Sequence, residues 1–484
     1  MAAIPTLITI AVYLLLLFVV ATRSSRNGNN ATFFKGNRKQ SPLVVAIAMM
    51  GAPISGISLI SLPGSVATGA FSYLQFMFGV VIGYAIIAYL LIPLFYRLNV
   101  TSLYEYLDGR FGISSHRSGA WIFFISKLLS ASLRAFVICI VVQQFLCNTL
   151  GVPFIVTAAL FMLFVWLYTR RGGVASVVWT DVLKTICMVG CIVLAIVFVL
   201  RSLGLSLGEA MTQASGRGFT QIFFFDDVND NRHFLKMFIS GIFLIVANTG
   251  LDQDIMQRVL SSRTERAAQR NMVLSSLSQV VIIGLMLVLG AMLHLYLVET
   301  SQCVAKADDV FAFVATREGV PMVLSVLLVL GIVSSTFSTT GSALTSLTTA
   351  FTMDILGGKS RYDEERLTRV RKGVHVAIAA VLMVLILAFE LWSNDSAINL
   401  FYRLASYTYG PLLGMFAFGI FTKRCVCDRW VPLVVILAPS LSFLLDHYSQ
   451  QLFSGYKFGF EILLVNAALT MIGLLMLSRR GDEK

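Results

Sequence analysis

The sequence predicts an all-α integral membrane protein with about thirteen membrane-spanning helices. Three observations support this fold class. The 484 residues are 57% hydrophobic and only 13% charged, whereas soluble globular proteins carry about 25% charged residues. Apolar stretches long enough to cross a bilayer as helices recur along the whole chain. Loops rich in basic residues alternate with loops poor in them, which is the pattern that orients membrane proteins.

The apolar stretches form one integral domain over residues 1–484, because no long polar block or Pro-, Ser- or Gly-rich linker divides them. The longest polar segment between two spans covers residues 202–233. In chain order, we expect the spans at residues 4–21, 42–70, 72–96, 119–148, 153–169, 175–200, 234–253, 272–298, 320–353, 374–393, 397–421, 430–447 and 458–477.

Loop charge predicts the orientation of these spans. The loops that we assign to the inside, with the C-terminal tail, carry 26 Lys and Arg residues, and the outside loops carry seven. This bias predicts an N-terminus outside, a cytoplasmic C-terminus and an odd number of crossings. The net charge of +12 therefore reflects membrane orientation, and we expect no nucleic-acid partner. No basic residue precedes the first span, which favours a retained helix over a signal peptide.

The second span is interrupted by helix-breaking residues. It contains M-M-G-A-P-I-S-G-I-S-L-I-S-L-P-G at residues 49–64, with two prolines and three glycines. Such a break leaves backbone groups without partners inside the helix, which a membrane tolerates only next to protein or a cavity. In transporters, carbonyls freed in this way bind ions and substrates. The alternative is an ordinary kinked helix.

The span at 320–353 contains a stretch crowded with hydroxyl side chains. Leu330–Asp354 reads L-G-I-V-S-S-T-F-S-T-T-G-S-A-L-T-S-L-T-T-A-F-T-M-D. Serine and threonine often pack at helix interfaces in membranes and bond back to their own helix. Hydroxyl oxygens are also ligands that a hard cation such as sodium prefers. At 100° per residue, six hydroxyl residues share one face about 100° wide: Ser335, Ser338, Thr339, Ser342, Ser346 and Thr349.

Charged residues inside spans mark candidate functional positions, because a charge in a membrane is costly. Asp181, in V-V-W-T-D-V-L-K, either binds a cation or pairs with Lys184 one turn later. Arg134 lies near the middle of the fourth span. It either satisfies carbonyls or a buried acid, or it binds a substrate carboxylate with its planar guanidinium. We expect Lys127 to extend to the inner surface.

Two further spans contain polar or helix-breaking runs. The seventh ends in A-N-T-G-L-D-Q-D-I-M-Q-R, whose acids are expected to pair with the Arg258–Arg270 cluster as a cytoplasmic lock. In the eleventh, Arg403 and Y-T-Y-G-P-L-L-G predict another interrupted helix. No phosphate loop, G-x-S-x-G or zinc signature occurs, and the seven cysteines suggest no disulfide framework. We therefore expect no enzyme.

Four segments resemble the sodium:solute symporter family, which includes the sodium–glucose, sodium–proline and sodium–sialic acid symporters. Their order and spacing extend the resemblance over roughly residues 1–480. It implies the LeuT-type fold: ten core helices in two inverted repeats of five over 42–421, preceded by one helix at 4–21 and followed by two at 430–477. The segments are T-S-L-Y-E-Y-L-D-G-R-F-G (101–112), G-G-V-A-S-V-V-W-T-D-V-L-K (172–184), D-Q-D-I-M-Q-R (252–258) and S-S-T-F-S-T-T-G-S with F-T-M-D-I (334–355).

The resemblance also implies a sodium site between core helix 1, the second span, and core helix 8, the stretch Leu330–Asp354. In the family, carbonyls at the helix 1 break join one carbonyl and two hydroxyls of helix 8. The corresponding carbonyls here belong to Gly51, Ile54 and Ser335, and the hydroxyls are those of Ser338 and Thr339.

Some family members hold a second sodium ion with an acid of core helix 5 and further helix 8 hydroxyls. Asp181 matches that acid, and Ser338 and Ser342 match two of the hydroxyls. Gly341 stands where such members have serine. The resemblance therefore leaves open whether this chain binds a second sodium ion.

The implied substrate pocket lies beside the helix 1 break. Its candidate residues are Ser55 and Ser58 after the break, Gln75 at the start of core helix 2, and Arg134 on core helix 3. An arginine on that helix resembles the residue that binds the carboxylate in the sialic acid symporters. The glucose-type pocket is not evident, because Gly56-Ile57-Ser58 replaces its acidic and amide residues.

The function implied is a sodium-coupled symporter that imports a small organic solute by alternating access. The solute is expected to bear a carboxylate, as a sialic acid, an amino acid or a monocarboxylate does. A sodium-coupled sugar symporter and a transporter-like membrane sensor are the alternatives. We expect Na⁺ as coupling ion, a solute and the lipid bilayer as partners, and no obligate protein partner. The expected location is the cell membrane, the inner membrane in a bacterium, as a multi-pass protein.

Overall fold

The computed structural model describes most of the chain from Ile54 onward. The first expected span, 4–21, and the candidate residues Gly51 and Ser55 lie outside the described residues. The backbone is described at residues 12, 15, 19, 54, 56–98, 102–143, 147–148, 151–260, 262, 264–315, 320, 322–392, 397–453 and 455–479.

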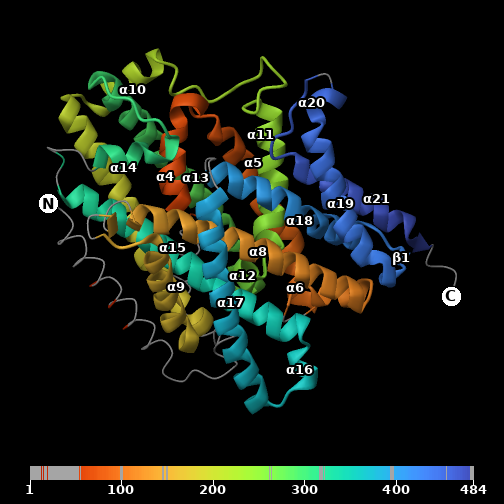
Figure 1. The fold of residues 1–484 in the computed structure, drawn as a ribbon. Coiled ribbons are helices and arrows are strands. Elements are labelled where there is room, and N and C mark those ends of the chain that lie inside the picture. The colour runs from red at the N-terminus through yellow and green to blue at the C-terminus, as the bar shows by residue number, and fades with distance from the viewer. Residues whose placement is uncertain are drawn as a thin grey trace.

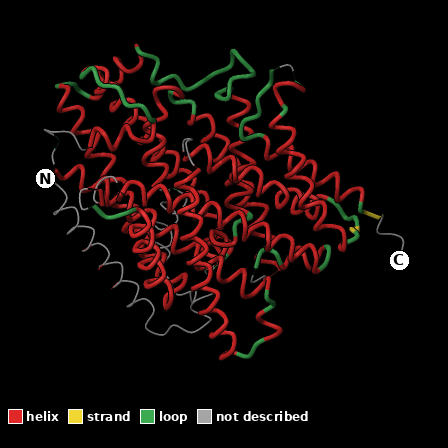
Figure 2. The backbone as a smooth tube through the Cα atoms, in the orientation of Figure 1, coloured by secondary structure: helices red, strands yellow, loops and turns green. Residues whose placement is uncertain are grey.

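Helices make up almost all of the described backbone (Figure 2). The first half contains α4 (Gly56–Gly69), α5 (Tyr73–Ile86), η2 (Ile87–Leu91), α6 (Ile92–Leu98), α7 (Glu105–Arg110), α8 (Ile113–Val142), α9 (Phe154–Leu203), α10 (Leu207–Gly216), α11 (Phe234–Ile245), η5 (Val246–Gly250) and α12 (Gln253–Leu260).

The second half is again helical, apart from two short strands. These strands, β1 (Cys425–Val426) and β2 (Ser478–Arg479), pair antiparallel with Cys425 opposite Arg479. The helices are α13 (Glu265–Glu299), η6 (Ala307–Asp309), α14 (Val310–Ala315), α15 (Met322–Ala350), η7 (Phe351–Ile355), α16 (Gly358–Arg361), α17 (Glu364–Trp392), α18 (Ala397–Phe421), η8 (Asp428–Trp430), α19 (Val431–His447), α20 (Ser449–Leu452) and α21 (Ile462–Met476).

The described residues contain eight helices that are long and apolar enough to cross a membrane. Three further apolar helices have 10–17 residues: Phe154–Arg170, Phe234–Gly250 and Ile462–Met476. The chain is therefore an all-α, multi-pass membrane protein, as predicted, while the total of thirteen spans stays a prediction. Figure 1 places α10 and α20 at one end of the bundle and α16 at the other, as the predicted orientation requires.

The longest helix, α9, contains 50 residues where the sequence predicts two spans. Phe161 packs against Phe337, with ring centroids 4.6 Å apart, and a Cβ on Gly331 would lie 3.8 Å from Cys191 Cβ. At 1.5 Å per residue, 161 and 191 would be about 45 Å apart in a straight helix, but 331 and 337 are about 9 Å apart. The run therefore folds back on itself, and its two halves correspond to the expected spans 153–169 and 175–200.

The sixth expected core helix is interrupted, and the described part of the first starts with one non-helical residue. Ile54 lies outside α4, which begins at Gly56, as the Pro/Gly run predicts. Between α11 and α12, the π-helical turn η5 is followed by Leu251 and Asp252, which are not helical. From the sequence alone, this second break is predicted only as a polar helix end.

The predicted interruption of the eleventh span is wrong, because α18 continues through Pro411. Proline removes the hydrogen bond to the carbonyl four residues earlier, which belongs to Tyr407. Asn466 of α21 supplies the missing donor: its Nδ2 atom donates to the Tyr407 carbonyl at 2.7 Å. Gly410 makes this possible, since a Cβ there would lie 2.4 Å from the Asn466 amide.

Candidate functional site

The helix break before α4 lies directly against the hydroxyl-rich helix α15. A Cβ on Gly56 would lie 2.8 Å from Thr336 Oγ1 and 3.2 Å from the Ile332 carbonyl. At the same junction, Ser335 Oγ donates to the Ile54 carbonyl at 3.4 Å. Glycine thus permits a close approach that brings a carbonyl freed by the break to the predicted face of α15.

Three further oxygen groups lie beside this junction. Ser335 and Ser338 are buried, and Ser338 donates its hydroxyl proton to Asp181. Thr339 donates to the Ser335 carbonyl at 3.1 Å, so its oxygen keeps lone pairs for another partner. The structure therefore brings together four of the five predicted sodium ligands: Ile54, Ser335, Ser338 and Thr339. Such uncharged oxygens, with one acid behind them, suit a hard monovalent cation.

Asp181 is bound to Arg258 of α12. Its Oδ2 atom lies 2.7 Å from Arg258 Nη1, and both side chains are buried. The alternative partner, Lys184, is fully buried as well, but its ammonium makes no hydrogen bond within the described part of the chain. Ser342 donates to Asp254 and accepts from Arg258. Of the three predicted second-sodium residues, Ser338 binds Asp181 directly, and Ser342 is joined to Asp181 through Arg258.

A second group of ion pairs joins this cluster. Arg258 Nη2 lies 3.3 Å from Asp254 Oδ1, and Lys127 lies 3.0 Å from Asp254 Oδ2 and 2.9 Å from Asp252 Oδ2. Tyr409 also donates to Asp252, at 2.9 Å. We call these five side chains and Asp181 the inner lock: Lys127, Asp181, Asp252, Asp254, Arg258 and Tyr409.

The inner lock confirms one prediction and corrects another. Asp254 pairs with Arg258, as the sequence predicted for the acids of this segment. The prediction that Lys127 extends to the inner surface is wrong, because its side chain is only 10% exposed and binds two carboxylates. A lysine flanked by two buried acids is stabilised in place, since its withdrawal would leave both charges uncompensated. The resulting pairs join α8, α9, α12 and α18.

Gly341 is glycine because Tyr168 of α9 occupies the adjoining space. A Cβ at this position would lie 1.7 Å from the Tyr168 hydroxyl oxygen. The same hydroxyl donates to the Phe337 carbonyl on α15. A serine side chain therefore does not fit at 341 unless Tyr168 moves.

Arg134 lies close to the proposed sodium ligands. It lines a cavity of about 20 Å³, which has room for about one water molecule. The same cavity is also lined by Lys127, Asn248, Thr339 and Tyr409. The structure thus joins the candidate carboxylate-binding arginine, the sodium-site threonine and the inner lock around one small space.

The other predicted substrate residues lie elsewhere. Ser58 is half-buried on α4, two residues after Gly56. Gln75 is fully buried, and its amide binds the loop before α11: Nε2 donates to the Arg232 carbonyl at 2.8 Å, and Oε1 accepts from Phe224 N at 3.2 Å. Its role in substrate binding stays a prediction.

Arg258 is the residue of the inner lock whose contacts the sequence predicts least specifically. It was expected in a basic cytoplasmic cluster, yet it bridges two acids from different helices. One local signal was available, because Asp254 and Arg258 are four residues apart and share a helix face. Its contact with Asp181 depends on the packing of α12 against α9 and α15, which no local pattern indicates.

With this geometry established, comparison with known proteins decides the family. The sodium:solute symporter family model matches residues 33–428. The chain belongs to this family.

Two curated relatives illustrate the sequence similarity. The chain is 22% identical over 455 residues to the sodium/sialic acid symporter SiaT of Proteus mirabilis, covering 91% of this chain and 89% of that protein. It is 25% identical over 410 residues to sodium-coupled monocarboxylate transporter 1 of Mus musculus, covering 80% of this chain. The chain spans 64% of that mouse protein's length.

A solved structure is similar over the whole chain. It is the substrate-bound outward-open state of a Na⁺-coupled sialic acid symporter, with a TM-score of 0.85 at 18% identity, covering 99% of this chain and 100% of that one. This similarity shows that the family member described here has the LeuT-type fold. Sodium is the coupling ion throughout these matches.

Proposed function

We propose that this protein is a sodium-coupled symporter that imports a small organic carboxylate. The observation that carries the proposal is the junction of the α4 break with α15. There the Ile54 carbonyl meets Ser335, while Thr339 shares a cavity with Arg134. A sodium ion and a carboxylate bound at these groups would be close neighbours, so each would favour binding of the other by charge.

Coupling follows from which helices the ion would join. Sodium would be held between α15 and the break before α4 by Ile54, Ser335, Ser338 and Thr339. The bound ion would therefore stabilise the arrangement in which these two elements touch. The inner lock is formed in the same arrangement. Release toward the inside then requires both the α4–α15 contact and the lock to open, which makes transport depend on a difference in sodium affinity between two states.

Arg134 is the proposed carboxylate-binding residue. Replacement of Arg134 by Gln removes the guanidinium charge while keeping a shorter, uncharged polar side chain. We expect saturable uptake of the carboxylate to fall at least about 30-fold, because truncating one partner of a buried, hydrogen-bonded charge pair costs about 2–5 kcal/mol. Sodium-driven uptake by proteoliposomes measures this effect. Arg429→Gln, at an exposed position in η8 between α18 and α19, is the matched control. Uptake by the Arg134 variant with an unchanged KM contradicts the assignment.

We further propose that one sodium ion accompanies each solute. The Asp181 carboxylate already binds Arg258 and Ser338, and Lys184, one turn away, adds another buried cation. Tyr168 excludes a side chain at 341. With Lys127, Arg258 and Lys184, the cluster already has three cations for its three acids. A second sodium ion would be a fourth cation, which like-charge repulsion disfavours.

The stoichiometry predicts an electroneutral cycle for a monocarboxylate. With one sodium ion per anion, uptake by proteoliposomes should show a Hill coefficient near one for sodium and no dependence on an imposed membrane potential. Reversal-concentration measurements with varied sodium and solute gradients give the ratio directly. A ratio of two sodium ions per solute, with uptake stimulated by a negative interior, contradicts the single-ion proposal.

The proposed function itself is tested by a substrate panel. Proteoliposomes would receive sialic acid, monocarboxylates, amino acids and neutral sugars, each with and without a sodium gradient. We expect sodium-driven uptake of carboxylates and none of neutral sugars. Uptake of a neutral sugar would favour the sugar-symporter alternative. Solute binding without uptake of any compound would favour a sensor.

A further inference from the structure

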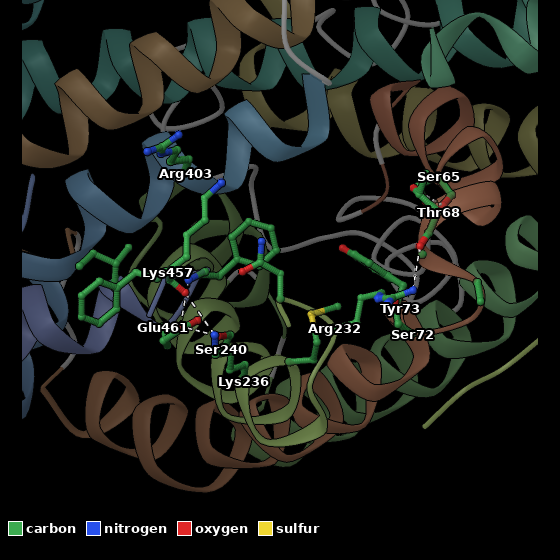
Figure 3. Close-up of a pocket in the computed structure, with 18 of the residues that line it drawn as sticks. Ser65, Thr68, Ser72, Tyr73, Arg232, Lys236, Ser240, Arg403, Lys457 and Glu461 are labelled. Atoms are coloured by element: carbon green, nitrogen blue, oxygen red, sulfur yellow. Dashed lines mark hydrogen bonds and ion pairs between the residues drawn. The ribbon is translucent and has the colours of Figure 1, made fainter. Parts of the chain in front are cut away.

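A second cavity, lined by both charged and apolar side chains, lies at the end of the bundle that the charge pattern predicts to face outside. Its volume is about 410 Å³, which is within the range of small-molecule sites. We call it the vestibule. It is bounded by the end of α4, the start of α11, the outer part of α18 and the loop between α20 and α21, as Figure 3 shows. Arg134 and the sodium ligands do not line it.

The vestibule wall carries more positive than negative charge. Four basic side chains and two acidic ones line it: Arg232, Lys236, Arg403, Lys457, Asp446 and Glu461. Two of the basic residues already have carboxylate partners. Arg232 binds Asp230 at 2.7 Å, and Arg403 binds Asp446 at 3.0 Å. The hydrogen bonds from Arg232 lower the pKa of Asp230, so this pair stays ionised and internally neutral.

Lys236 has a much weaker countercharge. Its side chain is only 6% exposed, and its nearest carboxylate oxygen, Glu461 Oε1, lies 4.0 Å away. The ammonium contacts the carbonyl of Lys457 at 3.2 Å and lies 4.0 Å from the centre of the Tyr456 ring. Carbonyls and a ring face stabilise a buried cation but do not neutralise it. Lys457, on the same wall, forms no ion pair within the described part of the chain.

Glu461 offers a complementary group beside this cation. Its Oε1 atom accepts from the Tyr456 hydroxyl at 2.8 Å and from Gly459 N at 2.9 Å. Its Oε2 atom is buried and accepts no hydrogen bond among the described residues. Burial, together with the bond to Glu461, raises the pKa of Tyr456 well above its usual value, so that hydroxyl remains a donor. Oε2 is therefore available to a donor on a ligand, such as a hydroxyl.

We propose that the vestibule is a binding site for a hydroxylated organic carboxylate, which it captures before the solute reaches Arg134. Lys236 and Lys457 would bind the carboxylate, and Glu461 Oε2 would accept from a hydroxyl. Tyr73 and Phe460 supply apolar wall area for the carbon skeleton. This inference rests on the proposed function for its transport role, but the binding site itself stands on the vestibule contacts.

Gln75 is then a positioning residue for the vestibule. Its Nε2 atom donates to the Arg232 carbonyl at 2.8 Å, and Arg232 Nη1 donates to the Thr68 carbonyl at 3.0 Å. The first bond fixes the loop before α11 to the start of α5, and the second fixes it to the end of α4. Figure 3 shows Arg232 beside Thr68. Helix α11, which carries Lys236, begins at Phe234, two residues after Arg232.

The transport test compares Lys236→Gln with the wild type in proteoliposomes, with sialic acid as the probe. We expect the KM to rise about fivefold to tenfold at low ionic strength, with an unchanged maximal rate and sodium activation. Added choline chloride should raise the wild-type KM more than that of the variant, because salt screens the vestibule charge. Lys236→Arg should restore most of the wild-type KM. Lys372→Gln, an equal charge change on the exposed side of α17, should match the wild type.

Equilibrium binding separates the vestibule from the proposed transport function. Arg134→Gln should retain weak, salt-sensitive binding of labelled sialic acid, and Arg134→Gln combined with Lys236→Gln should lose it. No binding by Arg134→Gln, or equal binding by both variants, overturns the vestibule proposal. Absence of sodium-driven uptake by the wild type, with this binding pattern intact, overturns the transport proposal and leaves the vestibule standing.

Discussion

Replacement of Ser338 by Ala should raise the sodium concentration for half-maximal uptake about 10- to 100-fold. The hydroxyl is a proposed sodium ligand, and it also donates to Asp181. Its removal takes away one ion ligand and leaves a buried carboxylate oxygen with one donor fewer, losses of about 1–3 kcal/mol. Each 1.4 kcal/mol corresponds to a tenfold change in affinity. Sodium titration of solute uptake at saturating solute measures the shift.

The matched control is Ser334→Ala. Ser334 is fully buried on the same helix, and its hydroxyl donates to the Gly331 carbonyl within α15 at 3.2 Å. This variant should keep the wild-type sodium activation, because no proposed ion ligand is removed. If both variants titrate like the wild type, Ser338 does not bind sodium. If both fall equally, the effect is one of folding.

Replacement of Arg258 by Met should open the inner lock and abolish coupled uptake. Arg258 is buried and binds Asp181 and Asp254. Removing one partner of a buried pair costs about 3–5 kcal/mol, and here it leaves two acids facing each other. A shift of that size is enough to move a closed gate to a largely open one. We expect a cysteine placed at Asn248 to react with an impermeant maleimide from the inner side, in a background without native cysteines.

Arg258→Lys serves as the conservative variant in that experiment. A lysine keeps the charge but lacks the planar fork that binds two carboxylates at once, so partial labelling and partial uptake are expected. Arg366→Met, an exposed position on α17, should behave as the wild type. Protection of the cysteine in Arg258→Met, with normal uptake, would show that the lock does not hold the inner side closed.

Hydrophobic periodicity and hydroxyl spacing were enough to predict much of this molecule. The apolar spans correspond closely to α8, α13, α15 and α17, because a membrane helix must satisfy its backbone internally and expose apolar side chains. The hydroxyl face of α15 was readable in the same way, since side chains three and four residues apart share a face. The placement of Ser335, Ser338 and Thr339 beside Ile54 followed from the family resemblance.

Contacts between helices distant in sequence could not be predicted from local patterns. The i, i+3 spacing of Asp181 and Lys184 suggested a pair, yet the packing of α12 supplies Arg258 instead. Pro411 suggested a break, yet Asn466 from α21 donates a hydrogen bond to the Tyr407 carbonyl, which Pro411 leaves without its helical donor. In both cases, the residue that decides the local structure lies more than 50 positions away in the chain, where periodicity carries no information.

The inner lock also determines how abruptly the inner side can open. Its pairs are strong because they are dry: two charges 4 Å apart attract by about 4 kcal/mol at an effective dielectric of 20, but by about 1 kcal/mol in bulk water. Asp254 binds both Lys127 and Arg258, so water that reaches one pair also weakens the next. Hydration would then spread through the whole lock in a cooperative step. Such a gate has few half-open forms through which ions could leak.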